Sequence, residues 1–123
     1  MFGTTRSDER SLVIASRGAE PIMMDAADCS AIDRLRGRIY GVVLSLPPQM
    51  ARDGSYEDAT ADLLSRFARW KLESLVYISS TSVYGDHQGA VVTEHTECQP
   101  DSPRGHARRA IEQQVLESGL PAM

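Results

Sequence analysis

Several features that would assign this chain to a specialised class of protein are absent or scarce. Its 123 residues include only two cysteines, Cys29 and Cys98, which cannot build a disulfide framework. No apolar run approaches the roughly 18 residues that cross a bilayer. The residues from Met1 to Arg10 lack the apolar core of a secretory signal. We therefore expect a cytoplasmic protein that has no membrane partner.

Positive charge and metal ligands are also in short supply. Thirteen lysines and arginines stand against 17 acidic residues, which gives a formal net charge of −4. A nucleic-acid partner needs a basic surface, so we expect none. His95 and Cys98 resemble half of a metal site, but no second ligand pair has matching spacing. We expect no bound metal.

The apolar residues form short runs that alternate with helical patterns. Strands are predicted at 1–5, 21–24, 39–44 and 75–78, and another begins at 120–123. Continuous apolar runs of this length are typical of strands buried on both faces of a parallel sheet. The alternation predicts an α/β fold, with flanking helices around a parallel sheet, in one domain over residues 1–123.

Helical spacing marks the segments between these strands. Ser7 can cap a first helix, which Gly18 ends, and a last helix is predicted from about Arg104 to Ser118. A short helix is expected around Ile32. The residues expected on inner helix faces are Leu12, Val13 and Ala15; Tyr56, Thr60, Leu63, Leu64 and Phe67; and Ala107, Ala110, Ile111, Gln114 and Val115.

One segment is far more specific than the rest. Val76 to Gly85 reads VYISSTSVYG, in which a buried strand ends in two serines and leads into Val-Tyr-Gly. This segment, with Glu94, Pro100–Pro103 and Glu112, resembles the extended short-chain dehydrogenase/reductase family, the NAD-dependent epimerase/dehydratase group. The resemblance implies a Rossmann-type fold that binds NADP or NAD. It also implies a small-molecule substrate, such as a nucleotide-sugar.

The two serines would lie where an open parallel sheet binds its ligands, outside the carboxyl ends of the strands. By resemblance, Ser80 matches the family's catalytic serine or threonine, whose hydroxyl bonds the substrate, and Ser79 is expected to contact the cofactor. Serine is also common in turns, so the alternative is that these residues form only a polar turn.

The resemblance also implies cofactor contacts earlier in the chain. Thr5 and Arg6 would follow the second strand of a complete fold, where an arginine meets the 2′-phosphate of NADP. Asp25 would contact the adenine, and Ser45 with Leu46 would line the ribose and nicotinamide side. The alternatives are a solvated arginine, an aspartate that caps a loop, and a strand that a proline terminates.

Two departures from the family pattern stand out. The chain contains no G-x-G-x-x-G, the loop that holds pyrophosphate at a helix N-terminus. We therefore expect the fold to be incomplete, without its first strand and glycine-rich loop, and the chain to be truncated at both ends. Cofactor binding should then be weakened or lost.

The second departure concerns the family's tyrosine–lysine pair. Arg104 and Arg108 occupy the matching positions, and a guanidinium does not exchange protons near neutral pH. Four residues apart on one helix, they could clamp an anion. The alternative is a basic, solvated helix face that also includes Arg109.

Three functional hypotheses remain open from the sequence. The first is an NAD(P)-binding epimerase/dehydratase-like or oxidoreductase-like protein, inactive as this fragment. The second is a non-catalytic nucleotide-binding sensor module. The third is a degenerate fragment without independent function, whose exposed sheet edge would favour homo-oligomers.

Overall fold

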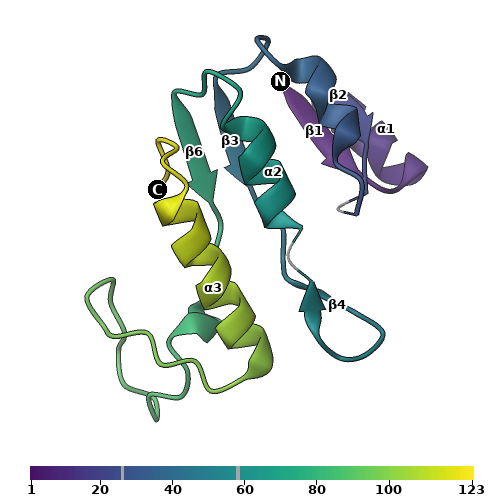
Figure 1. Ribbon diagram of the computed structural model, residues 1–123. Helices are drawn as coiled ribbons and strands as arrows, with labels where there is room; N and C mark the ends of the chain where they lie inside the picture. Colours follow the sequence, from purple (N-terminus) through teal and green to yellow (C-terminus); the bar gives the residue numbers. More distant parts are fainter. Residues whose placement is uncertain (26, 58) are drawn as a thin grey trace. The chain divides into compact units, whose positions relative to one another are not determined.

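A computed structural model describes residues 1–25, 27–57 and 59–123. They fall into two compact units, Met1–Ile39 (unit 1) and Tyr40–Met123 (unit 2). Each unit contains a pair of parallel strands (Figure 1), and each contributes buried side chains. The alternating α/β order that the sequence predicts is confirmed within each unit.

Unit 1 is a strand–helix–strand arrangement. Strand β1 (Phe2–Thr5) pairs in parallel with β2 (Glu20–Met23), and α1 (Asp8–Ser16) connects them. The side chain of Ser7 caps α1 by accepting a hydrogen bond from the backbone N–H of Arg10 at 3.4 Å. The chain leaves the helix through Gly18 at a φ of +80°, which a residue with a Cβ rarely adopts.

The expected inner face of α1 is wrong. Leu12 is 74% exposed and Val13 is 55% exposed, and α1 has no buried residue. Consecutive helical residues point about 100° apart, so only one of three neighbouring apolar residues can face the strands. Ile14 takes that place. A Cβ on Gly3 would lie 3.1 Å from its Cγ2, so the glycine makes room for it.

The core of unit 1 is small. The segment around Ile32 forms a 3-10 helix, η1 (Ser30–Leu35). Among the described residues of this unit, the buried apolar side chains are Ile22, Cys29, Ile32 and Leu35.

Unit 2 is built on a second parallel pair. Strand β3 (Gly41–Leu44) pairs with β6 (Ser74–Tyr77) in a register that joins Gly41 to Ser74 and Leu44 to Tyr77. The chain end then returns to β6, because the backbone N–H of Leu75 bonds the carbonyl of Pro121 at 2.8 Å. Where a strand was predicted to begin at 120–123, the structure has a single parallel bridge between Leu75 and Ala122 and no named strand.

A small hairpin, which the sequence pattern did not predict, follows β3 along the chain. Strands β4 (Gln49–Met50) and β5 (Tyr56–Glu57) pair antiparallel, so the assignment of Tyr56 to a helix is wrong. Asp53 shapes the turn by accepting hydrogen bonds from the N–H and hydroxyl of Ser55, and Gly54 adopts a φ of +83°. These turn-forming residues favour a hairpin, although the spacing of the apolar residues from Tyr56 onward is that of a helix.

Two helices carry most of the core of unit 2. Helix α2 (Thr60–Phe67) buries the stripe expected from its spacing, and the ring of Phe67 meets Trp70 edge-to-face at 5.2 Å. Helix α3 (Pro103–Glu117) begins where Ser102 Oγ accepts a hydrogen bond from the N–H of Gly105. The two helices contact one another (Figure 1).

The expected inner stripe of α3 is only partly correct. Ile111 and Val115 are buried, but Ala110 and Gln114 are exposed. Arg108 is buried in their place, which the sequence pattern did not indicate because arginine is rarely buried.

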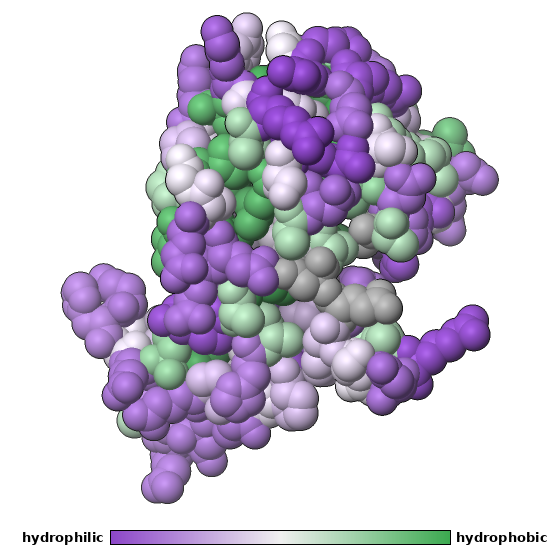
Figure 2. Space-filling view, viewed as in Figure 1, coloured by the Kyte–Doolittle hydropathy of each residue, from purple (hydrophilic) through white to green (hydrophobic). Residues whose placement is uncertain are grey.

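The visible surface is mostly polar, with smaller apolar areas between (Figure 2). Among the described residues, no helix has both the length and the apolar character that crossing a membrane requires. The same residues contain no group of three or more histidine, cysteine or acidic side chains placed to hold a metal ion.

Candidate functional site

The two serines at the end of β6 occupy different environments. Ser80 precedes a 3-10 turn, η2 (Thr81–Val83), and its Oγ accepts a hydrogen bond from the N–H of Ser82 at 3.3 Å. Ser80 is exposed, so its hydroxyl is accessible while it caps the turn. Ser79 Oγ is shielded from solvent and has no hydrogen-bond partner in the part of the chain that the structure describes.

Two glycines hold this turn against the rest of unit 2. Gly85 has a φ of +75°, and a Cβ there would collide with the backbone carbonyl of Gln99. A Cβ on Gly105 would lie 2.6 Å from the carbonyl oxygen of Ser82, so α3 approaches η2 closely. The glycine that ends the Val-Tyr-Gly motif is therefore needed both for its φ and for close packing.

Arg108 ties together the carboxyl ends of both parallel strands of unit 2. Its side chain is 6% exposed. Nη1 donates hydrogen bonds to the carbonyl oxygens of Leu46 at 3.3 Å and Ile78 at 3.4 Å, and to the phenol oxygen of Tyr77 at 2.9 Å. The hypothesis that Arg108 belongs to a solvated face is therefore wrong.

The neighbouring arginines behave differently. Arg104 is exposed. Arg109 donates from Nη1 to Glu112 Oε2 at 2.8 Å, and this hydrogen bond raises the pKa of Arg109. Arg104 and Arg108 thus differ in burial although they stand one helical turn apart.

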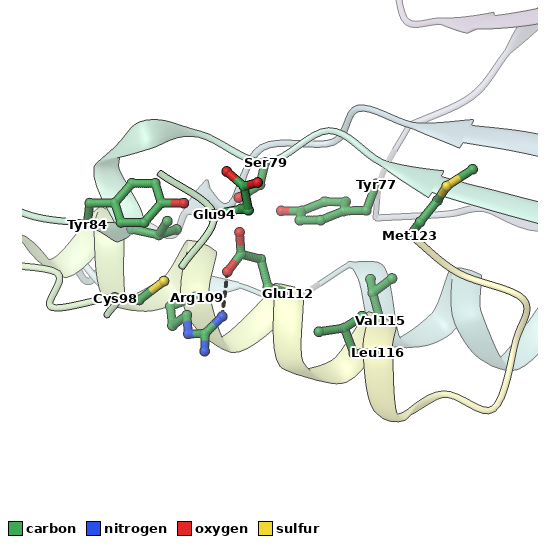
Figure 3. A pocket seen from close by; sticks show the side chains of 11 residues that line it. Tyr77, Ser79, Tyr84, Glu94, Cys98, Arg109, Glu112, Val115, Leu116 and Met123 are labelled. Atoms are coloured by element: carbon green, nitrogen blue, oxygen red, sulfur yellow. Dashed lines mark hydrogen bonds and ion pairs between the residues drawn. The ribbon is translucent and has the colours of Figure 1, made fainter. Parts of the chain in front are cut away.

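A cavity of about 260 Å³ opens between the end of β6, the loop that follows η2, and α3. Figure 3 shows the phenol groups of Tyr77 and Tyr84 directed toward one another, with Ser79, Glu94 and Glu112 between them in this view. The lining residues are Tyr77, Ser79, Val83, Tyr84, Glu94, Cys98, Arg109, Glu112, Val115, Leu116 and Met123.

Most of these lining residues were not predicted as site residues. The sequence does carry one signal for them, because Arg109, Glu112 and Leu116 are spaced three and four residues apart and so share a helix face. Ser79 is the only predicted site residue that lines this cavity.

Unit 1 contains a second cavity, of about 340 Å³, at the carboxyl ends of β1 and β2. Arg6 and Asp25, both expected to contact the cofactor, line it together, and Arg6 Nη1 lies 4.0 Å from Asp25 Oδ2. Asp25 also accepts a hydrogen bond from the N–H of Ala27 at 2.9 Å. Thr5 is buried, and its Oγ1 accepts a bond from the N–H of Ser7.

The two charged side chains of this second cavity can bind ligands of different kinds. The exposed guanidinium of Arg6 suits a phosphate, and the carboxylate of Asp25 suits a hydroxyl or amino donor. Ser45 and Leu46, the other expected cofactor contacts, belong to unit 2, where Ser45 is exposed and the carbonyl of Leu46 bonds Arg108.

Parallel strands joined through helices, with polar side chains at their carboxyl ends, define the class of Rossmann-type α/β folds. Residues 56–120 match the NAD dependent epimerase/dehydratase family, which covers more than half of the chain. The chain therefore belongs to the NAD dependent epimerase/dehydratase family, as the motif from Val76 to Gly85 predicted. A search of curated proteins gave no match.

Solved structures share the fold. A functionally unknown conserved protein from Silicibacter pomeroyi DSS is 32% identical with a TM-score of 0.74, over 98% of this chain and 41% of its own. UDP-glucuronic acid 4-epimerase from Bacillus cereus, in complex with UDP-glucuronic acid and NAD, is 22% identical with a TM-score of 0.74, over 95% and 43%. NADPH-dependent quinone oxidoreductase from Escherichia coli, complexed with NADPH, is 14% identical with a TM-score of 0.64, over 98% and 37%. The chain thus spans less than half of each protein.

Proposed function

We propose that this chain is part of the NAD(P)-binding region of an epimerase/dehydratase-like or oxidoreductase-like protein. The observation that carries the proposal is the meeting of Arg6 and Asp25 in one cavity at the carboxyl ends of β1 and β2. An anion-binding guanidinium beside an acceptor carboxylate suits the 2′-phosphate of NADP next to its adenine. The likeness to structures that hold NAD or NADPH supports the same cofactor class.

The substrate side of the proposal rests on unit 2. The exposed hydroxyl of Ser80 stands at the carboxyl end of a parallel strand, where it can donate to or accept from a substrate oxygen. By the same likeness the substrate is a small molecule such as a nucleotide-sugar.

The residues proposed for catalysis include no acid or base that could transfer a proton at the positions of Arg104 and Arg108. Arginine side chains stand at both positions where the family has tyrosine and lysine, and Arg108 is engaged with three acceptors. The proposal therefore includes that this chain binds a nucleotide but does not turn over a substrate alone. The fixed position of Arg108 favours a second candidate, a non-catalytic nucleotide-binding module.

A thermal melt of the chain with NADPH or NADH tests the proposal. A ligand that binds only the folded state stabilises it by about 2.7 kcal/mol at a hundredfold excess over Kd. We expect NADPH to raise the Tm, although only at high concentration because the chain has no G-x-G-x-x-G loop to hold the pyrophosphate, and we expect Arg6→Ala to abolish the rise. Arg10→Ala is the control, because it removes the same charge from the same unit outside the cavity.

Two results would contradict the proposal: a Tm that neither cofactor changes, or a rise that Arg6→Ala leaves intact. Oxidation of NADPH in the presence of a carbonyl substrate would reject the non-catalytic module and the claim that the chain cannot turn over.

A further inference from the structure

The edge of strand β3 that faces away from β6 is unpaired. On its inner side the carbonyl oxygen of Leu44 accepts a hydrogen bond from the N–H of Ile78 at 2.9 Å (Figure 1). The backbone groups of successive strand residues point to opposite sides, so those of Gly41 and Val43 point away from β6. Neither residue has a backbone partner on that side among the described residues. Strand β3 therefore presents open donors and acceptors along this edge.

Strand β6 is covered on the side that faces away from β3. The backbone N–H of Leu75 donates to the carbonyl of Pro121 at 2.8 Å, and that of Tyr77 donates to the carbonyl of Met123 at 2.9 Å. Of the two strands in this described sheet, only β3 thus lacks a backbone partner on one side. An additional strand would therefore join the sheet at β3.

Apolar side chains are exposed along the same edge. Val43, in the middle of β3, is 68% exposed, and its register partner on β6 is Val76. Ile78 follows Val76 by two residues, so it shares that face of the sheet, and it is 48% exposed. A strand that pairs with β3 would therefore also bury apolar surface, which favours association.

The segment that contains β3 is uncharged. No acidic or basic residue occurs from 39 to 51, although charged residues make up 24% of the chain. Charged side chains, prolines and bulges normally prevent an edge strand from pairing, and here the prolines follow only after β3 has ended. Because each copy carries a net charge of −4, an uncharged edge is where two copies approach with the least repulsion.

This edge is also complementary to itself. Two β3 strands related by a two-fold axis run antiparallel, and each Val43 then offers one N–H and one C=O to the same groups of the other copy. The two Val43 side chains lie opposite one another on the exposed face of the joined sheet. Such a pairing occupies the open edge of both copies, so it closes at a dimer.

We propose that β3 is a dimerisation edge, through which two copies of this chain pair antiparallel over Gly41–Leu44 with Val43 at the centre. The occupant of the edge is a second copy, and the two sheets join into one. None of these residues lines the cavity of unit 1 that contains Arg6 and Asp25, so the dimer is independent of the proposed nucleotide site.

Sedimentation equilibrium of the chain without nucleotide, over a wide range of protein concentrations, tests the dimer. We expect a monomer–dimer equilibrium. Val43→Lys should raise the dissociation constant at least about tenfold, because like charges directly opposite destabilise a strand pair. Val13→Lys is the matched control, since it makes the same change at a residue that is 55% exposed on α1, and it should leave the equilibrium unchanged.

Hydrogen exchange of the unchanged chain gives a second test that depends on no variant. The N–H of Val43 is protected only in the dimer, so its exchange should slow as the protein concentration rises. The N–H of Val42 faces β6 and should be protected equally at every concentration. Fluorescence of Trp70 shows whether Val43→Lys is folded, and exchange at Val43 decides the question if it is not.

The proposal is overturned if the chain is monomeric at every concentration, or if Val43→Lys associates as tightly as the unchanged chain. Loss of association in Val13→Lys instead would place the contact on α1. Growth into species larger than a dimer would overturn the closed, two-fold pairing. Exchange at Val43 that does not depend on protein concentration would show that this edge remains open.

Discussion

The role of Arg108 depends on its surroundings in the folded chain. In the sequence, Arg108 occupies the position of the family's lysine, one helical turn after Arg104. In the structure one of its nitrogens bonds three acceptors at the ends of β3 and β6. Its Nε is buried without a hydrogen-bond partner among the described residues. The side chain therefore holds two strand ends together, which is a positioning role.

Replacement of this side chain should be costly. Arg108→Met would leave the carbonyls of Leu46 and Ile78 without their charged donor. We expect the free energy of unfolding to fall by about 2–3 kcal/mol, since hydrogen bonds to charged groups contribute about 1.5–3 kcal/mol. Urea denaturation measures the change.

Arg104→Met is the matched control, because Arg104 is exposed on the same helix. It should change stability by no more than about 0.5 kcal/mol. Equal stability of the two variants would show that desolvation of the buried charge cancels its hydrogen bonds.

At the scale of elements, the residues at the helix ends are those that capping positions prefer. Helix α3 begins with Ser102 as cap and Pro103 in its first turn, and both preferences are strong at these positions. The chain leaves α3 through Gly119 at a φ of +72°. These signals allowed the last helix to be predicted within one residue at each end.

The cap of α3 gives a prediction at this scale. Ser102→Ala removes the acceptor for the N–H of Gly105 and should lower the free energy of unfolding by about 1 kcal/mol. Ser102→Asp restores an acceptor and should unfold at nearly the same urea concentration as the unchanged chain. If the alanine and aspartate variants were equally destabilised, the cap would contribute little and Ser102 would matter for another reason.

At the scale of the whole molecule, the described residues fall into two compact units. Trp70, the only tryptophan of the sequence, is buried in unit 2, whereas the buried apolar side chains among the described residues of unit 1 are all smaller. Tryptophan fluorescence therefore reports on unit 2 alone, while far-ultraviolet circular dichroism reports on the helices of both.

We expect the two signals to follow different urea transitions, with part of the dichroism lost before the fluorescence changes. The reason is that stability depends on the apolar area buried, which is smaller in unit 1. Superimposable transitions would instead show one cooperative domain over residues 1–123, as the sequence led us to expect.

The sequence by itself determined the α/β alternation, the helix caps and the family, because these depend on local chemistry and on one contiguous motif. It also singled out Arg6 and Asp25, which follow successive strands and so reach the same end of a parallel pair. It could not determine which of two adjacent serines is exposed, nor the exposure of Leu12 and Val13.

Only the tertiary structure decided that Arg108 is buried and that Ser79 lines a cavity with Glu94 and Glu112. The acceptors that bind Arg108 lie 30 to 62 residues away in the chain. Burial and pairing arise from contacts between distant segments, which periodicity within one segment does not encode. This is why the helix itself was predictable, whereas the partners of its arginines were not.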